Sequence, residues 1–156
     1  MEKQFLQLIH DHQGIIYKVS ALYRDNREDR EDLFQEIVYQ LWKSYPDFRG
    51  ASKPSTWMYR IALNTAIAIY RKPRLRVTHY TDLPQHLHPL QKEAESENEE
   101  QLFEALRILS DAEKAIVALY LEEFSYREMA AITGLSETNI GVRLNRIKNK
   151  LKEILK

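Results

Sequence analysis

The sequence predicts an all-α protein: two small helical domains joined by a flexible linker, the C-terminal one a helix-turn-helix domain. Apolar residues recur at helical spacing in several separate segments. An irregular stretch containing two prolines interrupts them, and near the C-terminus two capped helices flank a glycine turn. We expect domains at residues 1–75 and 98–156, with residues 76–97 as the linker.

The clearest motif lies in residues 125–150. Ser125 and Glu128 have the spacing of a capping box at the start of one short helix, and Gly134 supplies the left-handed residue that ends it. Ser136 is the predicted N-cap of a second helix. One face of this second helix carries the apolar residues Ile140, Leu144, Ile147, Leu151 and Ile154.

The opposite face of this second helix is polar and basic, as expected of a recognition helix in the major groove. Arginine can donate two hydrogen bonds to guanine, asparagine can pair with adenine, and lysines such as Lys150 and Lys152 suit phosphates. A merely solvated basic face is the alternative, but here it accompanies two caps and a turn. We therefore predict that the helix contacts DNA through Ser136, Thr138, Asn139, Val142, Arg143, Arg146 and Lys148.

The composition restricts the class of protein. The chain has no cysteine, which excludes disulfides and thiolate metal sites. Its most apolar stretch, residues 61–70, is far shorter than the ~20 residues of a membrane helix, and no signal peptide is visible, so we expect a cytoplasmic protein without membrane insertion. The formal net charge is zero, unusual for a stand-alone DNA binder. Basic and acidic residues instead form separate blocks, which indicates different partners for different surfaces.

Two apolar stripes predict the first two helices: residues 5–23, weakened at Gly14, and residues 29–45, stopped by Pro46. Polar and acidic side chains occupy the start of the second helix, among them Asp32, Gln35 and Glu36. Three interpretations stay open: compensation of the helix dipole, a metal-binding carboxylate pair, and a docking face for a basic partner. The metal site is the weakest, because neither histidines nor a second carboxylate cluster stand at ligand spacing.

A third helix is predicted for residues 56–71, ending before Pro73 because the residue that precedes a proline disfavours helix. Its expected core face consists of Trp57, Ile61, Ala62, Thr65, Ala68 and Ile69. Residues 48–76 contain several basic residues and no acid, interleaved with Phe48, Trp57, Tyr59 and Tyr70. This composition is typical of single-strand binding, where rings stack on bases. Aromatic core residues beside a solvated basic face are the better explanation on composition alone.

Residues 76–97 lack helical periodicity and contain Pro84 and Pro89, so we predict a linker. Its histidines have no fixed ligand geometry, and we expect neither a metal site nor a cofactor; they are His79, His86 and His88. Apolar periodicity resumes at residues 102–109. A second capping box, Ser110 with Glu113, then opens a further helix, whose apolar residues are Ile116, Val117, Leu119 and Tyr120.

Two helical domains of this kind resemble the extracytoplasmic-function (ECF) sigma factors of bacterial RNA polymerase, in the sigma-70 superfamily. The family's polymerase-clamp-binding helix is similar to DREDLFQEIVYQLW, and its promoter-melting element to FRGASKPSTWMYRIALNTA. The unit that binds the minus-thirty-five element is similar to LSDAEKAIVALYLEEFSYREMAAITGLSETNIGVRLNRIKNKL. The resemblance covers most of the chain, with two independent motifs in the family's order.

The resemblance implies a protein that directs promoter-specific transcription initiation and has no catalytic activity of its own. Its expected partners are promoter DNA, the β′ clamp and β flap of core RNA polymerase, and an anti-sigma factor. The implied clamp-binding residues are Asp32, Gln35 and Glu36. The implied residues for the minus-ten element and its melting, including capture of a flipped base, are Arg49, Ser52, Lys53, Trp57, Arg60 and Asn64.

One departure from the family pattern concerns the recognition helix. Gly141 and Val142 stand where members often carry a Lys-Ser pair, before the first of the two matching arginines, Arg143 and Arg146. We expect this difference to alter the preference for minus-thirty-five sequences.

Two other functions account for part of the sequence. A dimeric helix-turn-helix regulator acting on duplex operators explains the C-terminal domain but gives the acidic and aromatic-basic helices no role. A carboxylate-dependent nuclease explains the acidic residues but requires a metal constellation that the sequence does not provide.

Overall fold

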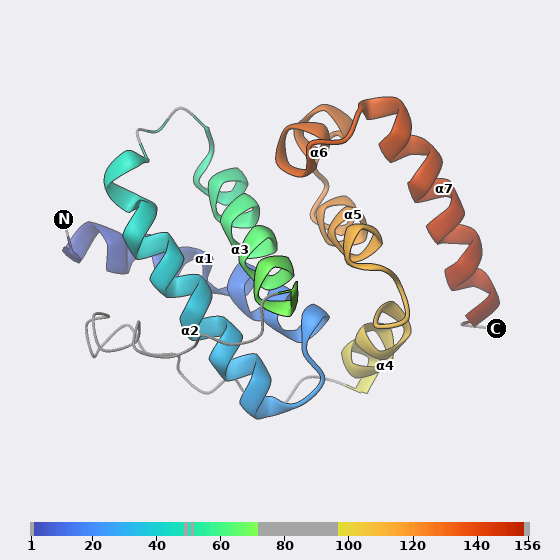
Figure 1. Ribbon diagram of the computed structural model, residues 1–156, viewed down its shortest axis with the longest axis horizontal. Coiled ribbons are helices and arrows are strands. Elements are labelled where there is room, and N and C mark those ends of the chain that lie inside the picture. Colours follow the sequence, from blue (N-terminus) through green and yellow to red (C-terminus); the bar gives the residue numbers. More distant parts are fainter. Residues whose placement is uncertain (1, 49, 51, 72–96, 155–156) are drawn as a thin grey trace. The chain divides into compact units, whose positions relative to one another are not determined.

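The computed structural model describes residues 2–48, 50, 52–71 and 97–154 (Figure 1). Within these residues all regular structure is helical, which confirms the predicted all-α class. The chain divides into two compact units, residues 1–91 and 92–156. The predicted linker histidines and Arg49 lie outside the described residues.

The N-terminal unit packs three helices: α1 (Glu2–Tyr23), α2 (Arg27–Ser44) and α3 (Pro54–Arg71), with the short 3-10 helix η1 (Tyr45–Asp47) after α2 (Figure 1). Each of the three contacts the other two. Their shared core is apolar, and its largest fully buried side chains are Phe5, Ile16, Ile37, Leu41, Met58 and Tyr59.

Local signals explain where these helices begin and bend. The Asn26 side chain caps α2 by accepting a hydrogen bond from the Asp29 amide at 2.9 Å, so the helix begins two residues earlier than predicted. The weakness predicted near Gly14 corresponds to a kink in α1 at His12, where φ is −123° and ψ is 18°. Helical structure does not end abruptly at Pro46, because α2 continues into the short 3-10 helix η1, which contains this proline.

The predicted core face of α3 is partly wrong. Ala62 and Thr65 are buried as expected, but Trp57 and Ile61 are only half-buried and Ala68 is exposed. The side chain of Ile69 lies outside the described part of the structure. The buried face is instead Thr56, Met58, Tyr59, Ala62, Leu63, Thr65 and Ala66. α3 contacts both α1 and α2, so it buries a wider and rotated stripe than a helix with one neighbour.

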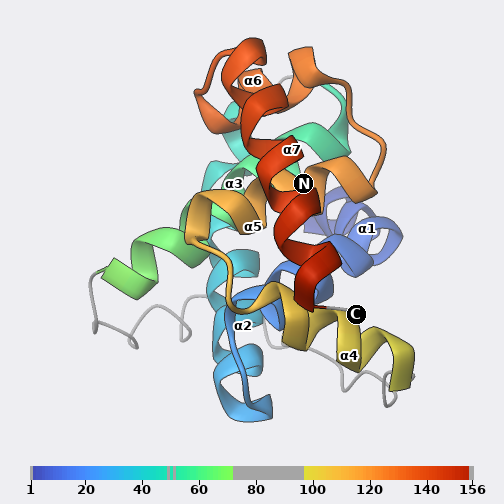
Figure 2. The same ribbon diagram turned by 90° about the vertical axis from the view of Figure 1, so that its right-hand side faces the viewer.

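The C-terminal unit consists of α4 (Glu97–Leu106), α5 (Asp111–Leu121), α6 (Tyr126–Thr133) and α7 (Glu137–Ile154) (Figure 2). The last and longest helix, α7, contacts the other three. Its buried residues Ile140, Leu144 and Ile147 confirm the first part of the predicted apolar stripe. The end of the stripe is not core, because Leu151 is half-buried and Ile154 is 41% exposed.

Candidate nucleic-acid interface

The predicted caps and turn of the helix-turn-helix are present. The Ser125 hydroxyl accepts from the Glu128 amide at 3.1 Å, and the Glu128 carboxylate accepts from the Ser125 amide at 3.0 Å. Gly134 ends α6 with φ of 82°, a left-handed conformation that favours glycine. The Ser136 hydroxyl accepts from the Asn139 amide at 3.0 Å and so caps the start of α7. These local bonds fix where α6 begins and ends and where α7 begins.

The outer face of α7 carries the residues predicted to contact DNA. Ser136, Thr138, Arg146 and Lys148 are exposed, and Val142 is 46% exposed. Asn139 and Arg143 are half-buried, and the Arg143 Nε donates to Asn139 Oδ1 at 3.1 Å. α7 therefore separates a buried apolar stripe from a polar, basic surface, as a recognition helix requires.

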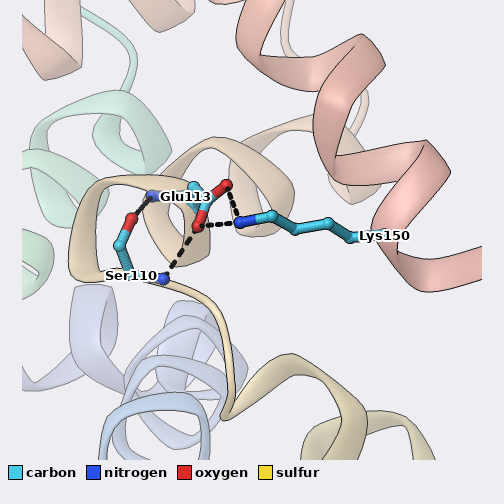
Figure 3. Close-up of polar contacts among 3 residues, drawn as sticks. All are labelled: Ser110, Glu113 and Lys150. Atoms are coloured by element: carbon cyan, nitrogen blue, oxygen red, sulfur yellow. Dashed lines mark hydrogen bonds and ion pairs between the residues drawn. The ribbon is translucent and has the colours of Figure 1, made fainter. Parts of the chain in front are cut away.

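Two lysines of α7 interact with α5. The Lys150 Nζ lies 3.3 Å and 3.0 Å from the two carboxylate oxygens of Glu113, in the capping box at the start of α5 (Figure 3). The Lys148 Nζ lies 4.6 Å from the centre of the Tyr120 ring, a cation–π contact. Lys150, which the sequence suggested for phosphates, thus forms an ion pair within the unit.

The surroundings of Glu113 favour its charged form overall. Burial alone raises the pKa of this carboxyl, but hydrogen bonds from Ser110 and from the Lys150 ammonium outweigh burial and hold the pKa below its usual value. The Ser110 amide donates to Glu113 at 3.0 Å, and Figure 3 shows both contacts meeting on one carboxylate. Glu113 therefore caps α5 and holds α7 at the same time.

Gly141, where the chain departs from the family pattern, lies against Tyr126 at the start of α6. A Cβ atom at Gly141 would lie 3.4 Å from the Tyr126 Cε2 atom. This distance is an ordinary van der Waals contact, so the Tyr126 ring of α6 packs closely against α7 at this position. A glycine within a helix is a signal of such a close approach, although the sequence alone does not identify its partner.

In the N-terminal unit, the described residues predicted for the minus-ten element lie on α3 and the loop before it. Ser52, Lys53, Arg60 and Asn64 are exposed. Trp57 is half-buried, with its ring stacked on Phe48 at a centroid distance of 4.5 Å and an interplanar angle of 21°. Tyr59, counted among possible base-stacking rings, is 1% exposed and belongs to the core. Phe48, Trp57 and Tyr59 therefore pack against other parts of the protein.

Further aromatic contacts connect the loop to α1. The Trp57 ring lies 6.3 Å from Tyr45, and Phe5 lies 5.2 Å from Tyr45 and 5.0 Å from Trp42, measured between centroids. This aromatic cluster of Phe5, Trp42, Tyr45, Phe48 and Trp57 joins the N-terminus of α1 to both ends of the loop. Sequence reasoning missed it because the cluster forms only when α1, which carries Phe5, and α3, which carries Trp57, pack against the end of α2.

The acidic side of α2 is less uniform than its sequence suggests. Asp32 is exposed and Gln35 half-buried, whereas Glu36 is only 8% exposed. The Glu36 Oε1 accepts a hydrogen bond from the side-chain Nε2 of Gln40 at 3.3 Å, and its Oε2 is buried without a hydrogen-bond partner among the described residues. Within those residues, no group of three or more His, Asp or Glu side chains is arranged to hold a metal ion.

Both units match established sequence families. Residues 8–76 match Sigma-70 region 2, and residues 99–151 match Sigma-70, region 4. RNA polymerase sigma factor SigV of Bacillus subtilis is 30% identical over 141 residues, which span 88% of this chain and 82% of SigV. The ECF RNA polymerase sigma-E factor of Haemophilus influenzae is 29% identical over an alignment of 172 positions, gaps included, which covers 99% of this chain and 90% of that protein.

Two solved structures share the fold. The structure of CnrH in complex with the cytosolic domain of CnrY matches with a TM-score of 0.71 at 22% identity, over 99% of this chain and 89% of that one. The sigma factor RpoE in complex with the anti-sigma factor NepR from Bartonella quintana matches with a TM-score of 0.70 at 21% identity, over 99% and 95%. With regions 2 and 4 in this order on one helical chain, the protein belongs to the sigma-70 family, in its ECF group of RNA polymerase sigma factors.

Proposed function

We propose that this sigma factor divides promoter recognition between its two units. The outer face of α7 binds the minus-thirty-five element, and the loop before α3 with the outer face of α3 binds and helps open the minus-ten element. The observation that carries this proposal is the basic, exposed face of α7 opposite its buried stripe, within the part that matches region 4.

At the minus-thirty-five element, Arg143 and Arg146 are the proposed readers of base edges. A guanidinium suits the paired acceptors of guanine in the major groove, and each such contact is worth about 1–3 kcal/mol of discrimination. Exposed Ser136, Thr138, Val142 and Lys148 complete the face around them. The Lys148 ammonium also lies over the Tyr120 ring of α5.

At the minus-ten element, the protein stabilises DNA that has already opened. Holding an unstacked base offsets part of the few kcal/mol that unstacking costs per step. The proposed contacts are exposed residues of the loop and of α3, namely Ser52, Lys53, Arg60 and Asn64. In this proposal Trp57 acts mainly by holding the loop through its stack on Phe48.

The proposed polymerase-binding surface is the start of α2, with Asp32 and Gln35 at the contact and Glu36 at its buried edge. The partners are core RNA polymerase, through its β′ clamp and β flap, and promoter DNA. The similar structures of CnrH with CnrY and of RpoE with an anti-sigma factor support an anti-sigma factor as a further partner. The protein acts in the cytoplasm with polymerase, and it contributes binding energy rather than a reaction of its own. Among the described helices, none is long and apolar enough to span a bilayer.

The dimeric-regulator alternative is not favoured. It accounts for the C-terminal unit, but it assigns no role to residues 8–76, which match region 2.

Run-off transcription with purified core polymerase tests the proposal. Promoter-specific transcripts should depend on the protein, and Arg143→Ala and Arg146→Ala should each weaken use of a promoter that depends on its minus-thirty-five element, by about 1–3 kcal/mol per bidentate contact. Binding of core polymerase, measured separately, should survive both substitutions. Normal transcription by both variants would contradict the assignment of α7.

A further inference from the structure

We propose that Asn139 is a positioning residue for Arg143 and not a reader of bases. Its side-chain oxygen holds the Arg143 guanidinium, so that the far end of the guanidinium meets one guanine. This inference rests on the proposed function of α7 as the recognition helix. The question is which of these two neighbours on the helix face, Asn139 or Arg143, contacts the base, and how the other residue affects that contact.

The contact that carries the inference joins Asn139 Oδ1 to Arg143 Nε at 3.1 Å. The two residues are four apart on α7 and therefore lie on the same face of the helix. Both side chains are half-buried, unlike their exposed neighbour Arg146. The backbone of Asn139 is held as well, because its amide donates to the Ser136 cap at 3.0 Å. The residue that accepts from Arg143 therefore lies in the first turn of α7, whose backbone is held by the Ser136 cap.

The chemistry of the guanidinium determines what this contact leaves available. Arginine has five N–H donors in a planar fork, and Asn139 accepts from Nε. The two terminal nitrogens keep their donors and can reach O6 and N7 of guanine together. A guanidinium held in this orientation loses less conformational freedom on binding, an advantage of roughly 3- to 10-fold in affinity. The expected result is a sharper preference for guanine at the base pair that Arg143 meets.

The same bond makes independent base recognition by Asn139 less favourable. An asparagine that recognises adenine uses its oxygen to accept from N6 and its nitrogen to donate to N7. Here the oxygen already accepts from Arg143. The oxygen keeps a second lone pair, so Asn139 can read adenine without releasing Arg143 only where N6 approaches that remaining lone pair, which restricts the geometry of the contact.

Arg146 is the matched control on the same face. It is exposed, and within the described residues it has no hydrogen bond or ion pair. The residue four positions before it is Val142, whose side chain has no acceptor. Arg146 is therefore not held in the way that Arg143 is, and a change at Asn139 should leave its base preference unchanged.

The experiment uses the full-length protein bound to core polymerase. Competitive binding is measured on a promoter set that carries each of the four base pairs at every position of the minus-thirty-five element. The variants are Asn139→Ala, Asn139→Asp, Arg143→Ala, Arg146→Ala and the double variant Asn139→Ala with Arg143→Ala. Thermal unfolding monitored by circular dichroism checks that each variant folds.

Arg143→Ala should abolish the preference at one base pair, and Asn139→Ala should reduce the preference at that same base pair by roughly 3- to 10-fold. In the Arg143→Ala background, Asn139→Ala should change little, within about twofold. Asn139→Asp keeps an acceptor for Nε, so it should retain the base preference even if phosphate repulsion weakens overall binding. Arg146→Ala should act at a different base pair, where Asn139→Ala has no effect.

Two results would overturn the inference while leaving the function of α7 intact. One is a loss of preference in Asn139→Ala at a base pair other than the one read by Arg143. The other is full additivity of the two substitutions, which would mean that Asn139 contacts DNA by itself. If Arg143→Ala and Arg146→Ala change no preference anywhere, the recognition-helix proposal itself fails, and this outcome is distinguishable from the first two.

Discussion

Glu36 is buried, although the sequence predicted it on the exposed, acidic side of α2. The side chain is 8% exposed, and its Oε2 is buried without a hydrogen-bond partner in the described part of the chain. A buried charged oxygen of this kind costs stability unless something compensates for it. In the proposed complex, a donor from polymerase would supply the hydrogen bond that Glu36 Oε2 lacks in the free protein.

Replacing Glu36 should separate stability from polymerase binding. Glu36→Met has a similar volume and removes the buried charge, so the free energy of unfolding should stay equal or rise by about 1 kcal/mol. Affinity for core polymerase should fall. Urea denaturation and a polymerase binding assay measure the two effects, with Asp32→Asn as an exposed control whose stability should change by no more than about 0.5 kcal/mol. A marked loss of stability in Glu36→Met would show that the carboxylate already has stabilising partners in the free protein, and would contradict this interpretation.

Asn64 is exposed on α3, on the surface proposed to meet melted DNA. Asn64→Ala should leave polymerase binding and the closed complex intact but reduce the open complex, because its hydrogen bonds form only to a base already out of the stack. Permanganate footprinting on a duplex promoter measures the defect, and a promoter with a pre-melted bubble should relieve part of it. Normal opening of the duplex promoter by this variant would remove Asn64 from the site.

At the scale of elements, the ion pair between Glu113 on α5 and Lys150 on α7 joins two residues that are 37 positions apart in the chain. It acts near the N-terminus of α5, at a residue that also completes the capping box of that helix. Because the pKa of Glu113 is held below its usual value, the charged pair stabilises the folded unit above that value. The contribution is lost as the pH falls through the folded pKa.

Glu113→Gln tests this contribution, since glutamine keeps an oxygen for the Ser110 amide but loses the charge. At pH 7 the variant should unfold more easily by about 0.2–1 kcal/mol, a modest value because the Lys150 side chain is 53% exposed. The difference from the natural sequence should shrink as the pH falls below 4.5, the ordinary value for this group. Urea titrations at neutral and acidic pH measure it.

Lysine substitutions provide the matched control for this pair. Lys150→Met should reproduce the loss seen in Glu113→Gln, whereas Lys152→Met, at an exposed position on the same helix, should have a smaller effect. Equal losses in the two lysine variants would mean that general charge in α7, and not the bond to Glu113, provides the stability.

At the scale of the whole molecule, the 23 basic and 23 acidic side chains cancel. Basic surfaces that suit DNA are therefore offset by acidic segments elsewhere in the same chain, and the protein lacks the general attraction that a strongly basic DNA binder has. Affinity for a promoter should come largely from the complex with core polymerase.

The free protein should accordingly bind promoter duplex weakly at physiological salt, and addition of core polymerase should restore tight, promoter-specific binding. Fluorescence anisotropy over a salt series measures both, and each phosphate contact should contribute about 0.9 to the slope of log affinity against log salt. Nanomolar, promoter-specific binding by the free protein would instead favour an independent regulator.

The sequence by itself determined that these helices exist, where the capped ones begin, and the helix-turn-helix. The capping boxes at Ser110 and Ser125 and the left-handed Gly134 were predictable because each depends on residues within about four positions of one another. The all-α class followed from apolar spacing for the same reason, since helical periodicity is a local property of the chain.

Only the tertiary structure decided which side of each helix is buried and which polar side chains are already bonded within the protein. The buried face of α3, the stack of Phe48 on Trp57 and the burial of Glu36 all depend on packing between helices. The engagement of Lys150 depends on a carboxylate on another helix. Contacts of this kind join residues distant in the sequence, and helical periodicity records that a face is apolar or charged but not which partner it meets.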